Sequence, residues 1–415
     1  MKKLHLILVG AVGLAVGCHA WADILDRPSG IKIGERMTLR PYVSTSLTYD
    51  SNVGGRGDDG KEDCLWTVSP TLGLTYDAGN WSLLLSAFYN YRMYFEDRYK
   101  SNRHEYGQDL RWQWSNSSGG EKGWSLVLGE SFRQITKADD LTLSDGTRYA
   151  GDYRQLQVSG AVQRRINEQW HGDVNASYYW LDYMNSGGGR GSYYYGWDRW
   201  TVGAEAGFAP SKWTDILLSG SYQGYSQDNL SGSGYSGDSQ GWSVQGGLGS
   251  YMTERISYRL LAGWSRFEYG DGLSTANGFV YTASGNWKIG ETWNTMLLAT
   301  SYYQPSERQY ASKSRIDAVS WGLAKSMVRG KLRATLDLRY RRETNEYELS
   351  GSGNDWDYVL NVITGRIGLD YTLNRFLSTF AYVEYQRSMN DEASKRGDLY
   401  DYDRWRATVG VRLSY

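Results

Sequence analysis

The sequence of 415 residues is poor in cysteine, histidine and proline. Its two cysteines are Cys18 and Cys64, and because Cys18 lies in the leader described below, we expect no intrachain disulfide in the mature chain. Two of the four histidines lie in the same leader, which leaves His104 and His171 and nearly excludes a histidine-rich metal site. We therefore predict no metal site and no cofactor.

Long apolar runs and an excess of one charge are missing as well. After residue 22, no apolar run approaches the roughly 20 residues that a membrane-spanning helix requires. The formal net charge is −1, which argues against a nucleic-acid partner. The chain is rich instead in tyrosine, tryptophan and glycine, with 35, 18 and 50 residues.

Residues 1–22 have the features of a secretory signal peptide. Two lysines follow Met1, an apolar stretch runs to Gly17, and "AWA" at 20–22 is a small-x-small cleavage site. We predict cleavage after Ala22, a short periplasmic segment at 23–36 and one folded domain at 37–415. The alternative is a lipoprotein signal in "LAVGC", in which Cys18 is acylated.

The chain ends on a strand pattern, "WRATVGVRLSY", in which apolar and polar residues alternate strictly. A soluble sheet seldom leaves such an edge strand uncovered, whereas a closed barrel has no edge. We expect this strand to pair with the first predicted strand, "TLRPYVSTSLTY". Its apolar residues also resemble the C-terminal signal by which outer-membrane barrels are recognised for assembly: Trp405, Val409, Val411, Leu413 and Tyr415.

From Met37 onward the chain divides into alternating segments of about the 9–11 residues that a tilted spanning strand needs, often slightly longer. Short connections, such as those at 77–80 and 373–375, alternate with long Gly/Ser/Asp-rich ones, such as those at 184–198 and 388–401. Counting both kinds predicts an all-β, antiparallel, up-and-down transmembrane barrel of about 18 strands, with 16 as the alternative. The even number places both termini in the periplasm.

Aromatic residues gather at the ends of the predicted strands. Trp and Phe follow the short turns, and Tyr precedes the long loops, as expected of rings at two membrane–water interfaces. Core aromatics of a soluble β-sandwich or propeller are the alternative. The first set is Trp81, Trp124, Trp170, Trp213, Trp293 and Phe376, and the second is Tyr49, Tyr94, Tyr183, Tyr225, Tyr269, Tyr303 and Tyr385.

The polar residues that alternate with apolar ones in each predicted strand include charges that would be costly in lipid but not in a water-filled lumen. We predict one basic wall from the first and last strands and a second from the strand at 331–340. A structural role, in which these charges pair across the wall with Asp337 and Glu384, stands beside a selectivity role. The predicted lumen-lining residues are Arg40, Arg333, Asp337, Arg339, Arg341, Arg404, Arg406 and Arg412.

Three aromatic residues are predicted on the same lumen-facing side of the strands and could stack against sugars: Tyr42, Phe88 and Tyr94. No catalytic constellation is evident: His104, with Glu105 beside it and Asp97 nearby, and His171, next to Asp173, are the only candidate dyads. We predict that the protein is not an enzyme.

The stretch "LRPYVSTSLTYDSNV", followed by "SPTLGLTYDAGNWSLLLSAFYNYRMYFEDRYKSNRHE", resembles the β-barrel porin-2-like family. That family includes outer-membrane barrels associated with exopolysaccharide and exosortase gene clusters. The resemblance rests on a first strand ending Y-D-S-N, a second opening near S-P and a Tyr-rich third strand. It implies an outer-membrane barrel with a role in polysaccharide export or passage.

We expect an outer-membrane protein of a Gram-negative-type envelope, porin-like, that lets hydrophilic solutes or exported polysaccharide pass. The short segment before the first strand is too small for a plug domain. The alternative is a surface structural or adhesion barrel that acts through its long external loops. Expected partners are outer-membrane lipid and lipopolysaccharide, the barrel assembly machinery, and polysaccharide or small hydrophilic solutes.

Overall fold

The computed structural model describes residues 30–53, 61–96, 103–116, 123–142, 148–183, 196–211, 213–227, 238–250, 255–269, 274–304, 313–346, 358–390 and 401–415. The predicted signal peptide and the Cys18 alternative lie outside these residues. Within the described ranges, no helix is long and apolar enough to span a membrane.

The described chain is a single antiparallel sheet of strands. Their bounds are β1 Ile31–Ile33, β2 Met37–Val53, β3 Lys61–Asp77, β4 Trp81–Tyr94, β5 Arg103–Ser115, β6 Gly123–Thr142, β7 Arg148–Arg165, β8 Trp170–Tyr183, β9 Trp197–Ser211, β10 Thr214–Gln227, β11 Ser239–Ser250, β12 Ile256–Tyr269, β13 Ser274–Ile289, β14 Trp293–Gln304, β15 Lys313–Met327, β16 Leu332–Glu346, β17 Tyr358–Thr372, β18 Leu377–Asn390 and β19 Tyr402–Ser414.

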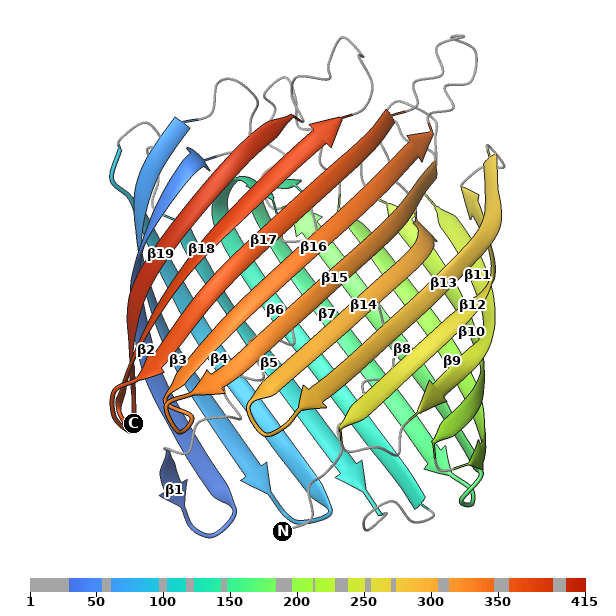
Figure 1. Cartoon of the computed structure of the whole chain (residues 1–415). Helices are drawn as coiled ribbons and strands as arrows, with labels where there is room; N and C mark the ends of the chain where they lie inside the picture. Colours follow the sequence, from blue (N-terminus) through green and yellow to red (C-terminus); the bar gives the residue numbers. More distant parts are fainter. Residues whose placement is uncertain are drawn as a thin grey trace.

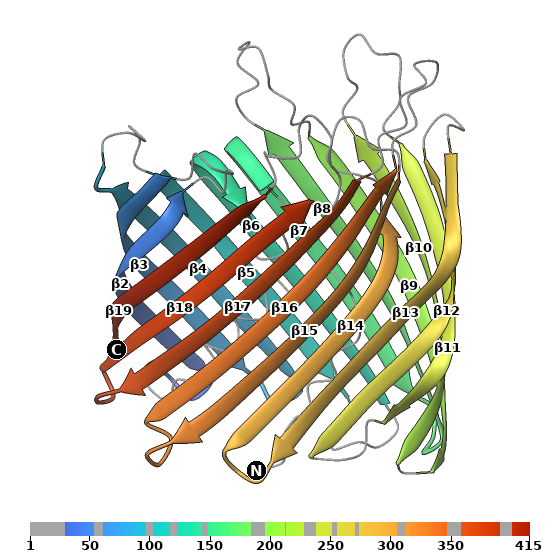
Figure 2. The ribbon, with the colours of Figure 1, turned by 45° about the horizontal axis from the view of Figure 1, so that its top comes forward.

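From β2 to β19, each strand pairs with the next, and β19 pairs back with β2. The result is a closed barrel of 18 strands, which confirms the predicted fold and excludes the count of 16. Figure 1 shows β19 lying beside β2. In Figure 2, the front strands β14 to β18 slope one way and strands of the far wall slope the other, as tilted strands of a closed barrel do.

Alternation along each strand separates the two faces of the sheet. On β2, Val43 and Leu47 are 44% and 45% exposed, whereas Thr48 and Asp50 are 7% and 1% exposed. Successive side chains of a strand point to opposite faces, so the first pair lies on the outer face and the second on the inner face. The register between neighbouring strands carries this assignment around the whole barrel.

The seam between β2 and β19 is held by side chains as well as by the backbone ladder. The Arg404 guanidinium forms a buried ion pair with the Asp50 carboxylate, with Nε 2.9 Å from Oδ1. The Thr48 and Thr408 hydroxyls are 2.7 Å apart. The backbone N–H of Trp405 donates to the Ser51 hydroxyl at 2.8 Å.

The short strand β1 was not predicted. It pairs with the start of β2, from Ile33 opposite Met37 to Ile31 opposite Leu39. The last strand reaches only as far as Tyr42, with one further bond from the Tyr415 N–H to the Pro41 carbonyl. β1 therefore pairs the edge of β2 beyond the end of β19, where the ladder would otherwise be open (Figure 1).

The wall bends sharply inward at β11 and β12. A Cβ at Gly247 would lie 1.8 Å from the Leu260 carbonyl oxygen, and one at Gly263 would lie 1.9 Å from that of Val244. Only glycine fits such a close approach of two strands. The bend brings β10 and β14 together, since the Gln223 side-chain amide donates to the Tyr303 carbonyl at 3.3 Å.

Short turns gather at the end of the barrel that also holds β1 and Tyr415. In the turn between β7 and β8, the Asn167 side chain accepts the backbone N–H groups of Gln169 and Trp170. Asn374 makes the equivalent bonds between β17 and β18. Asparagine stabilises tight turns in this way, which explains why these connections need few residues.

Candidate functional site: the inner wall of the barrel

The inner wall has two unlike parts. The strands β16 to β19 and β2 to β6 carry most of the inward arginines, and we call this part the arginine sector. The remaining strands, β7 to β15, carry mainly Ser, Gly, Ala, Thr and Gln on the inner face, and we call this part the small-residue sector. The inward arginines of the arginine sector are Arg40, Arg92, Arg103, Arg111, Arg133, Arg333, Arg339, Arg341, Arg366, Arg404, Arg406 and Arg412.

Carboxylates share the inner face of the arginine sector but are fewer than the arginines. Several arginines pair with them: Arg92 with Glu105 at 3.2 Å, Arg341 with Glu343 at 3.0 Å, and Arg406 with Glu384. The pairs of Arg92 and Arg406 join neighbouring strands, whereas that of Arg341 lies along β16, and the arginines remain in excess. The inward carboxylates are Asp50, Asp63, Asp77, Glu105, Asp109, Asp337, Glu343, Asp370 and Glu384.

A second group of arginines lies over aromatic rings of the inner face. The guanidinium carbon of Arg366 is 3.9 Å from the Tyr382 ring centroid, and that of Arg412 is 5.4 Å from the Phe380 centroid. A ring face attracts a cation without adding a negative charge. These contacts orient the arginines and do not cancel their charge.

The residues predicted from the first and last strands occupy one continuous part of the wall. Arg40 lies on the inner face of β2 near the short-turn end. Arg406 and Arg412 lie on the inner face of β19, whereas Arg404 is only 9% exposed and belongs to the seam.

The residues predicted from the strand at 331–340 lie on the inner face of β16. Arg333 is in register with Asp370 on β17, and Asp337 with Arg366. Arg339 stands opposite Thr364 and Ser320, and Arg341 pairs with Glu343. β17 and β18 separate this group from β19, so the two predicted walls belong to the same arginine sector. Their role in the passage of solutes stays a prediction.

Two of the three predicted sugar-stacking rings carry a guanidinium on one face. Arg133 lies 5.6 Å from the Phe88 centroid and Arg103 lies 4.7 Å from that of Tyr94. Tyr42 lies on the inner face of β2, in register with Ser414 and Thr71. One face of the Phe88 ring and one face of the Tyr94 ring therefore contact an arginine.

The inward arginines of β4 to β6 and of β17 were not predicted from the sequence. The register of these strands places four arginines on the same inner face: Arg92, Arg103, Arg111 and Arg133. The signal was present, because each alternates with outward apolar residues in its own strand. Arg366 could have been found in the same way.

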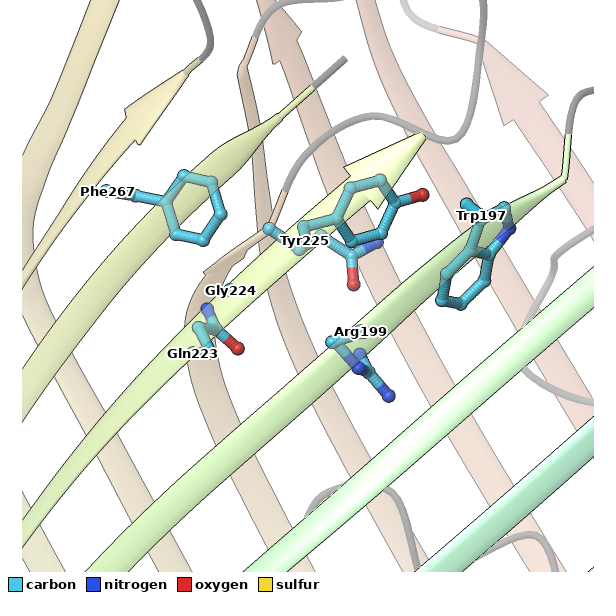
Figure 3. Close-up of a pocket in the computed structure, with 7 residues that line it drawn as sticks. Trp197, Arg199, Gln223, Gly224, Tyr225 and Phe267 are labelled. Atoms are coloured by element: carbon cyan, nitrogen blue, oxygen red, sulfur yellow. The ribbon is translucent and has the colours of Figure 1, made fainter. Parts of the chain in front are cut away.

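An apolar cluster covers the small-residue sector toward the end opposite the short turns. Trp197 stacks between Tyr179 and Tyr225, with centroid distances of 4.7 and 5.0 Å. Both faces of the indole are therefore occupied. Figure 3 shows Trp197, Tyr225 and Phe267 around a small pocket, with Arg199 and Gln223 among its polar groups. The buried members are Ile135, Tyr153, Leu181, Trp197 and Tyr225.

The prediction that the tyrosines before the long loops form an interfacial band is wrong for several of them. Tyr225 and Tyr269 are each 6% exposed and lie on the inner face, and Tyr94 lies there too. Tyr49 and Tyr385 lie on the outer face, as an interfacial ring would. Position near a strand end did not decide the face, because the phase of the alternation does. The side chain of Tyr183 lies outside the described part.

The candidate dyads do not share one arrangement. His104 is on the outer face of β5, 2.6 Å from the Tyr89 hydroxyl, whereas Glu105 points inward. His171 and Asp173 both lie on the inner face of β8. Asp97 lies outside the described residues. In the described ranges, no group of three or more His, Cys, Asp or Glu could hold a metal ion.

The apolar residues of the predicted assembly signal lie on the outer face of β19. Trp405, Val409, Leu413 and Tyr415 are all more than half exposed there, and Val411 is 38% exposed. The Tyr415 ring packs against Phe376 in the neighbouring turn, with centroids 5.9 Å apart. Recognition by an assembly machinery stays a prediction.

Solved structures similar to this chain include two siderophore receptors and an iron transporter. The siderophore receptor PiuA from Acinetobacter baumannii has a TM-score of 0.47 and 9% identity, over 93% of this chain and 82% of that chain. The siderophore receptor PirA from the same organism has 0.44 and 8%, over 93% and 81%. The FrpB iron transporter from Neisseria meningitidis has 0.44 and 10%, over 95% and 83%.

No curated protein matches the sequence. A protein family described as "Putative beta-barrel porin 2" matches residues 27–415. Because this match spans the described barrel from β1 to Tyr415, the chain belongs to the beta-barrel porin 2 family.

Proposed function

We propose that the barrel lets hydrophilic solutes, including an exported polysaccharide, pass across the outer membrane through its interior. Membership of a porin family and the barrel architecture indicate an outer-membrane location. Beyond this location, we propose an open interior whose chemistry selects the solutes that pass.

The observation that carries the proposal is the separation of the two faces. The outer face exposes Leu, Val, Ile and Trp around the barrel, whereas the inner face carries arginines, carboxylates and small polar residues. Charges on an inner face are tolerated when that face is in contact with water. Barrels of 16–18 strands are wide enough to enclose an aqueous channel.

The arginine sector supports a preference for anions. Its arginines exceed its carboxylates, and aromatic rings lie against some of the guanidinium groups, such as those of Arg366 and Arg412. A lumen lined by an excess of one charge concentrates ions of the opposite charge. An acidic glycan or a small organic anion is therefore the solute class that the inner wall favours.

Planar-bilayer recording of the purified full chain tests the proposal. We expect discrete, steady conductance steps in KCl that neutral polymers of increasing size progressively block. Heat-unfolded protein from the same preparation is the control. A folded barrel that inserts but gives no steps would contradict the proposal and favour a surface structural or adhesion barrel.

We also propose how the chain reaches the membrane and what surrounds it there. The leader at 1–22 would export the chain, and the outer-face residues of β19 would be read by the assembly machinery. Lipopolysaccharide would surround the outer rim. The protein would act without catalysis.

A further inference from the structure

One charged residue, Glu130, lies in the middle of the apolar outer face, away from the strand ends. Glu130 lies on the outer face of β6, in register with Leu110 on β5 and Val158 on β7. Among the described spanning strands, the other outer-face charges lie toward strand ends, as Asp198, Glu268 and Lys325 do.

Glu130 is paired with a second polar side chain on the same face. The side-chain amide of Gln108 donates to the Glu130 carboxylate at 3.1 Å. Gln108 is exposed and lies midway along β5, between His104 and Tyr106 toward one end and Trp112 and Trp114 toward the other. Rings of this kind lie at membrane interfaces, so the pair faces the hydrocarbon layer. Polar groups at that depth are costly unless another protein covers them.

The surface around the pair is apolar and includes two small residues. Gln108 stands between Ala87 and Phe132 of the neighbouring strands, and Gly160, diagonal to Glu130, has a Cβ position 3.2 Å from the Leu128 side chain. Leu128 and Val158 are 45% and 43% exposed. Small residues beside a polar pair allow two membrane proteins to approach closely and to exchange hydrogen bonds.

We propose that the outer face of β5 and β6, centred on Gln108 and Glu130, is the contact surface for a second copy of this chain. The pair is complementary to its own image: Gln108 keeps a second amide N–H, and Glu130 keeps a second carboxylate oxygen. Two copies inserted in one membrane share the same orientation. A twofold axis along the membrane normal therefore brings Gln108 of each copy to Glu130 of the other at equal depth. The inference does not depend on whether the lumen conducts.

Disulfide trapping in native outer membranes tests the contact. Leu110 lies on the outer face beside the pair, so Leu110→Cys in a Cys64→Ser background leaves Gln108 and Glu130 intact. We expect an oxidant to produce a linked species of twice the monomer mass. Ala262→Cys in the same background, on the outer face of β12, is the matched control and should stay monomeric. Equal linking at both positions or at neither, or an adduct of another mass, would overturn the proposal.

A second variant asks whether the polar pair holds the dimer. Gln108→Leu with Glu130→Leu gives a uniformly apolar surface that suits lipid, so the barrel should keep its heat-modifiable migration. We expect this variant to lose the Leu110→Cys cross-link and to run as a monomer in detergent. Glu130→Gln, which preserves hydrogen bonding, should retain the dimer. Undiminished linking in the double-leucine variant would contradict the role of the pair.

Discussion

At the scale of single residues, the most consequential contact joins the two ends of the chain. Arg404 and Asp50 lie 354 positions apart, and their side chains are 10% and 2% exposed. A buried carboxylate is stable only while a cation and hydrogen bonds compensate it. Arg404 thus contributes to barrel closure, although its alternation pattern is the same as that of the lumen-lining arginines.

Replacing Arg404 with Met should destabilise the barrel, because Asp50 would keep a buried charge without its partner. We expect the free energy of unfolding to fall by about 3–5 kcal/mol, measured by denaturant titration in detergent micelles with tryptophan fluorescence. Adding Asp50→Asn should recover much of the loss.

The matched control is Arg387→Met on the outer face of β18, where the ion pair with Asp403 is long, at 3.9 Å, and about half exposed. An exposed pair of this kind contributes at most about 1 kcal/mol. If the Arg404 and Arg387 variants lost equal stability, the seam contact would not have the role assigned to it.

At the scale of elements, β1 covers the part of the β2 edge that β19 does not reach at the seam. β19 ends opposite Pro41 and Tyr42, so the first residues of β2 would present an open edge. β1 folds back through the turn at Gly34, which has φ +69°, and pairs with that edge. Its isoleucines, Ile31 and Ile33, extend the apolar outer face.

Deleting residues 28–35 should therefore loosen the start of β2 but leave the barrel closed. We expect faster amide exchange at Met37–Leu39 and a stability loss of about 1 kcal/mol for each ladder hydrogen bond removed, measured by hydrogen-exchange mass spectrometry. A variant with Ile31→Ala and Ile33→Ala keeps the ladder and serves as the control. Unchanged exchange in the deletion would show that β1 does not protect this edge.

At the scale of the whole molecule, the inner wall is asymmetric. The arginine sector covers one side, and the small-residue sector, with its stacked rings at Trp197, covers the other. The sharp bend at Gly247 and Gly263 further reduces the circularity of the barrel. A solute inside would meet most of the inward arginines on one side and mainly small or aromatic side chains on the other.

Neutralising Arg366 and Arg412 by glutamine should reduce anion preference. Removing one charge about 8 Å from a permeating ion changes its energy in water by about 0.5 kcal/mol, on the order of a twofold change in ion concentration. Reversal potentials in a KCl gradient measure the effect, with Arg387→Gln on the outer face as the control. A chloride-to-potassium permeability ratio equal to that of the unmodified protein would contradict an electrostatic role for the arginine sector.

The alternation of single residues determined the class of fold, the 18 strands and the face on which Arg333, Arg339 and Arg412 lie. A strand repeats every two residues, so the local sequence suffices to separate two faces. Tyr225 and Tyr269 were expected at an interface because they stand near strand ends, but the phase of the alternation places them inside. The short strand β1 has too few residues for a period to show.

Only the tertiary structure decided which residues meet. The Asp50–Arg404 pair, the bend at β11 and β12, and the contact of Arg366 with Tyr382 each depend on the register between strands. Register and curvature are properties of the closed sheet, because a change in the register of one strand changes all of its cross-strand pairs at once. The sequence by itself thus determined the face on which most side chains lie, and closure of the barrel determined which partner each side chain has.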